Sequence, residues 1–259
     1  MIVLKSEREI ALMRRAGALV ARVLQELGKA VAPGVRLSDL DRLAEDIIRS
    51  AGAVPAFKHY GEIPGQRPPF PASICASLNE QVVHGVPDGR RLREGDVLSV
   101  DVGAFLEGFC GDAAATFPVG RISPLAEKLL RVTREALMAG VAMAVPGNHL
   151  SDISHAVQTY AEKNGFSVVR EFVGHGVGRE MHEDPQVPNF GPPGLGPVLR
   201  PGMTLAIEPM VNAGGPEVVV LGDGWTVVTA DGSLSAHFEH SVAVTTDTPL
   251  ILTWPEEEG

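Results

Sequence analysis

The chain has 259 residues, of which 44% are hydrophobic and 21% are charged, and its formal net charge is −10. This length allows one large domain or two small ones, and the hydrophobic content is sufficient for a sizeable core. The negative charge argues against broad binding of a nucleic-acid backbone, although it does not exclude a local basic patch.

The sequence contains no run of about 18 apolar residues, so we expect no membrane span. The first residues, MIVLKSEREIALMRR, have early glutamates and no long apolar stretch, so we expect no signal peptide. The two cysteines, Cys75 and Cys110, show no paired spacing. We therefore expect no disulfide framework. We expect a cytoplasmic location instead.

Two helices are predicted at the start of the chain. Ser6 and Glu9 have the spacing of a capping box, and an apolar stripe of helical period follows them. Pro33-Gly34 ends this first helix. Ser38 begins a second amphipathic helix, which continues to about Ser50.

Loops and strands are predicted next. Residues 61–71 are rich in Pro and Gly and indicate a loop, and residues 73–78 indicate a strand. A turn at 87–89 precedes the decamer LREGDVLSVD at 92–101. Two strand-like runs then meet at a turn near 106–108.

The same order of elements then returns. A helix is predicted from Pro124 to about Ala144, and residues 146–153 (PGNHLSDI) repeat the pattern of residues 33–40 (PGVRLSDL). A further helix reaches about Lys163.

A strand at 167–172 and a Gly/His-rich loop at 174–182 follow, and then a second decamer, LRPGMTLAIE, at 199–208. In the last part of the chain, the sequence predicts several strands, with hairpin turns at Asp223-Gly224 and Asp231-Gly232.

The two decamers end in single carboxylates, Asp101 and Glu208. A carboxylate buried without a partner is costly, so each acid alone is most simply interpreted as a solvated strand end. Because the two acids hold matching positions in a repeat, they favour a shared site instead.

The repeated helix–helix–strand order predicts one α+β domain of two related halves, at about 6–120 and 121–253, with a short acidic tail at 254–259. Strands that cluster favour antiparallel pairing, and a ligand site is expected where the two halves meet.

Several polar residues are candidates for chemistry. Asp101 and Asp112 flank the turn near 106–108, and a tight hairpin would place them nearly opposite each other, either as two solvated acids or around a divalent cation. His175 and His182 lie in the loop GHGVGREMH, where they are either surface residues or a metal ligand and an acid–base group. Glu239, in SAHFEHSVAV, has the pattern of an ordinary exposed acid on a strand.

Five segments together resemble the signature blocks of the type I methionine aminopeptidases: NEQVVHGVP, SVDVGAFLEGFCGD, FVGHGVGREMH, LAIEPM and AHFEHSVAVT. The resemblance spans nearly the whole chain and matches the bacterial form. It implies the pita-bread fold, in which two pseudo-symmetric halves surround a dinuclear metal site and a mostly antiparallel sheet.

The resemblance also implies residue roles. The metal ligands would be Asp101, Asp112, His175, Glu208 and Glu239, holding two divalent ions (Co, Mn, Fe, Ni or Zn). Catalytic roles would fall to His84, His182 and Glu208, with both histidines contacting the substrate. The carbonyls of Asn79, Gln81 and Ser235 would hold a monovalent cation. The methionine pocket would be formed by Tyr60, Phe70, Cys75, Met181 and Trp225.

Three features depart from the family pattern. Residues 61–69 form a longer loop than usual at the expected pocket mouth. Met181 stands where phenylalanine is common, and His237 stands where glutamine is common. These departures leave the ligand set intact and affect the details of the pocket.

The implied activity is removal of the N-terminal methionine from nascent polypeptides after deformylation, with a preference for a small second residue. Proximity to the ribosome is compatible with this activity, and a monomer is expected. Two alternatives are open: an Xaa-Pro aminopeptidase or prolidase, which usually carries a further N-terminal domain, and a non-enzymatic binding protein on the same fold, which typically lacks some of the ligands.

Overall fold

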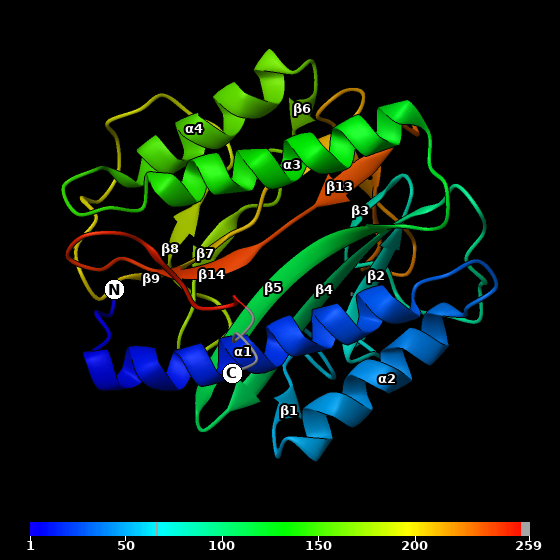
Figure 1. Cartoon of the computed structure of the whole chain (residues 1–259), viewed down its shortest axis with the longest axis horizontal. Helices are drawn as coiled ribbons and strands as arrows, with labels where there is room; N and C mark the ends of the chain where they lie inside the picture. Colours follow the sequence, from blue (N-terminus) through cyan, green and yellow to red (C-terminus); the bar gives the residue numbers. More distant parts are fainter. Residues whose placement is uncertain (66, 255–259) are drawn as a thin grey trace.

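The computed structural model describes residues 1–65 and 67–254, which form four helices and fifteen strands. Figure 1 shows the helices as two pairs, with strands between them. The helices are α1 (Glu7–Ala30), α2 (Leu37–Ser50), α3 (Pro124–Ala142) and α4 (Leu150–Lys163). Among these described residues, none of the helices combines the length and apolar character that a membrane span requires.

The N-terminus of α1 confirms the predicted capping box. The Glu9 backbone N–H donates to the Ser6 hydroxyl (3.4 Å), and the Ser6 backbone N–H donates to the Glu9 carboxylate (2.9 Å). These bonds satisfy donors that a helix start leaves unpaired. Helix α2 begins one residue before the predicted Ser38, and its N-cap, Arg36, makes no side-chain capping bond.

All strand pairs are antiparallel, as predicted, and the strands divide into four sheets. One sheet joins β1 (Val54–Pro55), β4 (Val97–Leu106), β2 (Ile74–Leu78) and β5 (Phe109–Pro118). A second joins β15 (Leu250–Ile251), β14 (His240–Ala243), β9 (Thr204–Ile207), β7 (Gly174–Gly176) and β8 (Glu183–Val187). The third contains β13 (Ser235–His237), β10 (Met210–Asn212) and β6 (Ser167–Val168), and the fourth β11 (Val218–Val220), β12 (Val227–Thr229) and β3 (Gln81–Val83).

The repeat in the sequence is visible as repeated backbone contacts. Before α2, the Gly34 N–H donates to the Leu92 carbonyl (2.7 Å), and before α4, the Gly147 N–H donates to the Leu199 carbonyl (3.1 Å). In both halves the segment that starts the second helix is thus tied to the first residue of the decamer. The two halves of the chain share this connection.

Each decamer turns at a glycine. Gly95 and Gly202 have φ angles of 92° and 93°, in the left-handed region that favours glycine. The chain then enters β4 in the first half and β9 in the second. Asp101 lies inside β4, whereas Glu208 comes directly after β9, so the two acids do not hold the same position in their strands.

Three local predictions are wrong. The strand predicted at 167–172 is limited to β6. The Asp231-Gly232 turn does not form a hairpin, because β12 pairs with β3 and β11, whereas β13 pairs with β10. The segment 235–243 is divided into β13 and β14, because the chain passes from one sheet to another. At this break the Glu239 N–H donates to the Ala114 carbonyl of β5 (2.9 Å).

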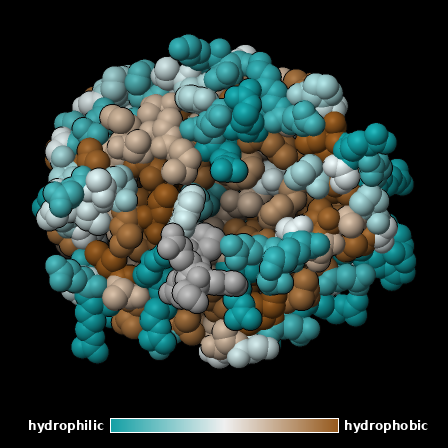
Figure 2. Space-filling model, viewed as in Figure 1, coloured by the Kyte–Doolittle hydropathy of each residue, from teal (hydrophilic) through white to brown (hydrophobic). Residues whose placement is uncertain are grey.

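Apolar side chains form separate clusters in the two halves. One cluster joins α1 and α2 to β2 and β4, and another joins α3 and α4 to β6 and β13. In the view of Figure 2, hydrophobic residues also gather in a band across the middle of the surface, with hydrophilic residues above and below. A further cluster, which includes Phe70, Cys75, Met181 and Trp225, lies beside the candidate site.

Candidate active site

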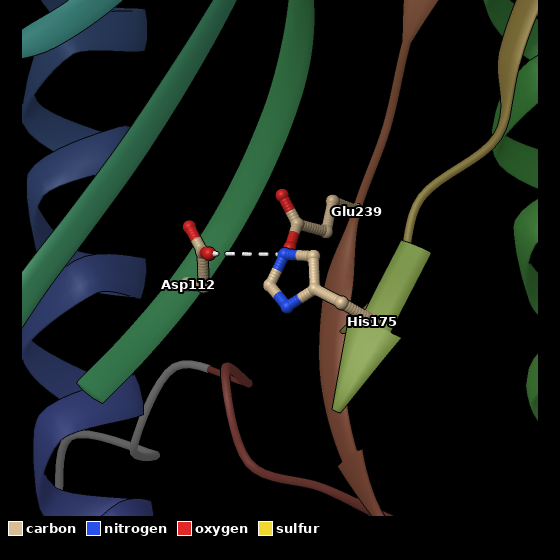
Figure 3. Close-up of side chains that lie close together, drawn as sticks. All are labelled: Asp112, His175 and Glu239. Atoms are coloured by element: carbon tan, nitrogen blue, oxygen red, sulfur yellow. Dashed lines mark ion pairs between the residues drawn. The ribbon is translucent and has the colours of Figure 1, made fainter. Parts of the chain in front are cut away.

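Three buried side chains from distant parts of the chain converge at one point. Asp112 comes from β5, His175 from β7, and Glu239 from the break between β13 and β14. Each offers one ligand atom, and these atoms lie within 4.8 Å of one another. Figure 3 shows the three side chains pointing toward one another, with His175 Nε2 3.8 Å from Asp112 Oδ2.

Asp101 and Glu208 line the same cavity, so the five residues of the implied ligand set share one site. His175 Nε2 lies 3.4 Å from Glu208 Oε1. The predicted pairing of Asp101 with Asp112 is wrong in register, because Asp101 is opposite Ala114 and Asp112 is opposite Gly103. The two aspartates are thus diagonal neighbours on one face of the sheet, at a separation that typically reaches about 7–8 Å.

In the part of the chain that the structure describes, the carboxyl groups of the site lack hydrogen-bond donors and positive charges that would compensate for their burial. Burial raises the pKa of Asp101 to about 7, and burial with the charge of Asp101 raises that of Asp112 well above its usual range. Burial and neighbouring carboxylates likewise raise the pKa values of Glu208 and Glu239. Among the described residues, Asp101 Oδ1, Asp112 Oδ1 and Glu239 Oε1 are buried and accept no hydrogen bond. Divalent cations fit this arrangement, because they would supply the missing positive charge.

Glu239 is not the exposed acid that its strand pattern predicts, since only 2% of its surface is exposed. The alternating polar residues of its segment, Ser235, His237 and Ser241, are buried with it. His237 lines the cavity, and the two serine hydroxyls bond neighbouring segments: that of Ser241, for example, donates to the Asp112 carbonyl (2.7 Å).

His175 is oriented as a metal ligand would be. Its Nδ1 lies 2.9 Å from the Gly176 carbonyl, which can only accept a hydrogen bond, so Nδ1 carries the proton. The unprotonated Nε2 then faces Asp112 and Glu208, and burial lowers the pKa of His175 to about 4. A ligating histidine is commonly fixed by such a bond from its other nitrogen.

His182 and His84 lie beside the cluster. The His182 ring is 4.2 Å from that of His175 between centroids, and its Nδ1 is 2.7 Å from the Tyr60 hydroxyl. His84 has a φ of 58° and packs edge-on against Trp225, with ring centroids 6.1 Å apart. Burial lowers the pKa of both histidines, to about 4 for His84.

The cavity has a volume of about 270 Å³, and apart from the carboxylates and histidines its walls are largely apolar. The five expected pocket residues all line it, and Phe70 meets Trp225 edge to face with centroids 5.1 Å apart. Other lining residues had not been identified from the sequence: Phe57, Arg67, Val83, Phe172, Val173 and Met210. Their apolar or charged character alone does not distinguish them from core or surface residues.

His237, noted in the sequence only as a departure from the family pattern, also lines the cavity. Its Nε2 is buried, has no hydrogen-bond partner among the described residues, and lies 3.7 Å from Glu208 Oε2. Burial lowers its pKa to about 3. The neutral imidazole of His237 therefore faces Glu208, as does that of His175.

The three residues implied in binding a monovalent cation do not line the cavity. Two of them are in contact, since the Ser235 N–H donates to the Asn79 carbonyl (2.9 Å). Gln81 is close to Asn79 through its side chain, which accepts from the Leu78 N–H (2.9 Å).

The pKa shifts predict how the stability of the metal-free protein depends on pH. The four raised carboxyl pKa values mean that the folded state binds more protons than the unfolded state above about pH 4, so stability falls as the pH rises. His84, His175 and His237, with lowered pKa values, act in the opposite direction, but only below about pH 6.5. Of these two opposing effects, only that of the carboxyl groups remains above pH 7.

We therefore expect the melting temperature in chelator to fall between pH 7 and pH 9 by at least about 5 °C, and added divalent cations to suppress the fall. Differential scanning calorimetry at matched ionic strength measures this. Asp101→Asn, which removes one of the four groups, should reduce the slope. A melting temperature that is constant over this range in chelator would contradict the electrostatic account of the cluster.

The comparisons with known proteins agree with this geometry. The pattern of metallopeptidase family M24 matches residues 11–246. Methionine aminopeptidase 1 of Bacillus subtilis (strain 168) is 54% identical over 245 residues, which are 95% of this chain and 96% of that protein. The methionine aminopeptidase of Clostridium acetobutylicum is 55% identical over 254 residues, with 98% and 99% covered.

Solved structures show the same fold. The crystal structure of methionine aminopeptidase from Thermotoga maritima has a TM-score of 0.94 and 49% identity, and the match covers 99% of this chain and all of that one. The prolidase from Pyrococcus horikoshii OT3 has a TM-score of 0.78 but only 22% identity, and 65% of its chain is covered, so it shares the fold alone. The chain therefore belongs to metallopeptidase family M24 and, within it, to the methionine aminopeptidases.

Proposed function

We propose that the protein removes the N-terminal methionine from nascent proteins and peptides, after deformylation, when the second residue is small. The observation that carries the proposal is the position of the acidic cluster. Five residues with metal-ligating side chains line a cavity whose other walls are largely apolar. A methionine side chain suits such walls, because a thioether is unbranched and makes favourable contacts with aromatic rings.

Asp101, Asp112, His175, Glu208 and Glu239 would hold two divalent cations. The mixed oxygen and imidazole set is compatible with Co, Mn, Fe, Ni or Zn. When bound, such ions would supply a deprotonated water at neutral pH and electrostatic stabilisation of the developing oxyanion.

The remaining work would fall to side chains of the chain itself. Glu208 would accept the proton that the attacking water loses and transfer it to the leaving amine. His182 would donate a hydrogen bond to the oxygen of the tetrahedral carbon from Nε2, since the Tyr60 hydroxyl occupies its Nδ1. His84, which also lines the cavity, would position the scissile amide.

A monovalent cation bound by the carbonyls of Asn79, Gln81 and Ser235 belongs to the same proposal. Its support is the contact between the Asn79 and Ser235 segments and the left-handed φ of Asn79, 57°, which bends the chain there. Such an ion would stabilise the folded protein by binding to it selectively, so melting temperatures in potassium, sodium and a bulky organic cation should differ.

Substrate specificity provides the test of the proposed function. We expect rapid cleavage of Met-Ala-Ser and at least about 100-fold lower kcat/KM for Met-Lys-Ser, because a long second side chain would clash beside His84 and His182. Formyl-Met-Ala-Ser should resist, since its amine is blocked. Norleucine in place of methionine should be cleaved more slowly but not refused, since a difference of about one methylene is worth only about 1–3 kcal/mol.

Cleavage rates of these peptides, with and without chelator, check the prediction. Ala-Pro-Ala serves as the comparison for an Xaa-Pro aminopeptidase. Similar kcat/KM for all three methionine peptides would disprove the specificity and leave a metallopeptidase of broader range. Cleavage of Ala-Pro-Ala in preference to Met-Ala-Ser would favour the alternative enzyme, and no cleavage would favour a binding protein.

A further inference from the structure

The long loop at 61–69 has an ordered connection to the cavity wall. At its base, the Phe70 N–H donates to the Tyr60 carbonyl (2.9 Å), so two pocket residues hold its ends together. Further out, Ile63 and Arg67 exchange two backbone hydrogen bonds, each 2.9 Å long. The described part of the loop therefore has a fixed path, and it brings Arg67 back toward the cavity.

The Arg67 side chain is held on the pocket wall by two contacts. Its guanidinium carbon lies 4.1 Å from the ring centre of Trp225, and its Nε donates to the Gly61 carbonyl (2.8 Å). The Trp225 indole N–H in turn donates to the Pro68 carbonyl (2.9 Å), which binds the same loop to the same ring. Within residues 1–65 and 67–254, the Arg67 side chain uses Nε alone for hydrogen bonding, so its terminal nitrogens can contact a ligand.

Glycines make room for this arrangement. A Cβ atom at Gly61 would lie 2.6 Å from Trp225 Cη2 and 3.1 Å from Arg67 Nη2. A Cβ at Gly224 would lie 3.3 Å from Arg67 Cγ. Both glycines have positive φ angles, 70° and 76°, so the backbone is shaped around the stacked side chain on two sides.

The charge of Arg67 differs from that of its surroundings. Of the described residues that line the cavity, it is the one with a permanent positive charge, and the other ionisable groups among them are carboxylates, histidines, a thiol and a phenol. Its charge reaches the neighbouring groups: after burial and His182, it contributes to lowering the pKa of His84 to about 4. A substrate chain that passes His84 on its way out therefore meets a positive charge.

We propose that Arg67 is a specificity-determining residue that recognises an acidic side chain at the third position of the substrate. This inference rests on the proposed function, in which methionine occupies the apolar cavity and the second residue lies beside His84 and His182. Each further residue of an extended chain advances about 3.3–3.6 Å, so in this inference the third residue is the first to pass the half-buried, stacked guanidinium. A carboxylate there would be attracted, and a lysine would be repelled.

The test compares C-terminally amidated peptides, so that no terminal carboxylate competes: Met-Ala-Glu-Ser, Met-Ala-Gln-Ser and Met-Ala-Lys-Ser. For the metal-loaded wild type at low salt, we expect kcat/KM to be about 5–10-fold higher with Glu than with Lys, the sum of one attraction and one repulsion at a partly exposed site. At about 1 M salt, where the screening length is about 3 Å, the ratio should approach one.

Variants of Arg67 distinguish the effect of its charge from the effect of its packing. Arg67→Gln should bring the Glu/Lys ratio close to one, whereas Arg67→Lys, which keeps the charge, should retain most of it. Arg170→Gln is the matched control, because Arg170 also stacks on an aromatic ring, with its guanidinium carbon 5.2 Å from the Phe190 centre, but does not line the cavity. It should leave the ratio unchanged.

The outcomes distinguish this inference from the proposed function. Equal cleavage of all three peptides by the wild type, or a ratio that Arg67→Gln does not change, would overturn the role of Arg67 and leave the aminopeptidase activity standing. Failure to cleave any Met-Ala peptide would overturn the function and this inference together. If Arg67→Gln does not fold, the role of Arg67 is judged from the salt dependence of the wild-type Glu/Lys ratio of kcat/KM.

Discussion

Replacement of His182 by alanine is expected to lower kcat by about 10²–10⁴-fold while the metal content stays at the wild-type value. The ring lies beside His175, with 4.2 Å between centroids, and its hydrogen bond goes to Tyr60 rather than to a carboxylate of the cluster. Its removal would take away a donor to the reacting oxygen and leave Asp112, His175 and Glu239 in place. Steady-state kinetics and metal analysis of the same preparation measure the two effects.

Two further variants define the effect of His182. Tyr60→Phe removes only the hydroxyl at Nδ1, so we expect a loss of about tenfold or less, the value of one hydrogen bond. His155→Ala is the matched control, since His155 is on α4, bonds the Gly191 carbonyl and does not line the cavity. A His182→Ala protein that loses its metals and keeps its rate per bound metal would show that His182 is a ligand instead.

Much of the fold is predictable from local sequence, because each copy of the repeat contains residues that its backbone conformation requires. The glycines of the decamers, Gly95 and Gly202, must adopt left-handed φ angles, and they mark the same turn in both halves. Pro-Gly before α2 and α4 marks the connection to each decamer, which the structure forms with backbone bonds at Gly34 and Gly147. These signals depend on a few neighbouring residues, so a single sequence contains them.

Features that depend on pairing between distant segments were not predictable in the same way. The diagonal position of Asp101 and Asp112 follows from a two-residue turn at Glu107-Gly108, which sets the register of the whole hairpin. The burial of Glu239 depends on its backbone bond to Ala114 of β5, a contact across 125 positions (239 minus 114). Polar alternation in a strand indicates one distinct face, but it does not tell whether solvent or a site covers that face.

The pocket was predictable only in part, for a related reason. Tyr60, Phe70 and Trp225 were expected through the family resemblance, and they line the cavity. Arg67 was not expected, because an arginine in a loop of glycine and proline has the composition of an ordinary surface residue. Its position depends on the stacking with Trp225, 4.1 Å away and 158 positions later (225 minus 67).

Asp112→Asn is the variant expected to have the largest effect on the metal site. Asp112 contributes to the three-residue cluster and approaches His175 at 3.8 Å, and only 3% of its surface is exposed. The amide has nearly the same shape but no charge, so it would bind a cation much more weakly. Loss of an outer-shell partner typically costs about 10–100-fold in affinity or activity, and we expect loss of a direct ligand to cost more.

Stability measurements determine whether such a loss comes from the metals or from misfolding. The substitution should have opposite effects on the stability of the metal-free protein and on the stabilisation by metal. In the metal-free protein, burial and the charge of Asp101 oppose ionisation of Asp112, so removal of its charge should raise the melting temperature above pH 7. In the presence of divalent cations, the same variant should be stabilised less than the wild type, since it binds fewer ions. Asp46→Asn, at an exposed position of α2, should change neither value. An Asp112→Asn protein with wild-type metal content and full activity would contradict the ligand assignment, whereas a variant destabilised equally with and without metal would show that Asp112 serves only to hold β5 in place.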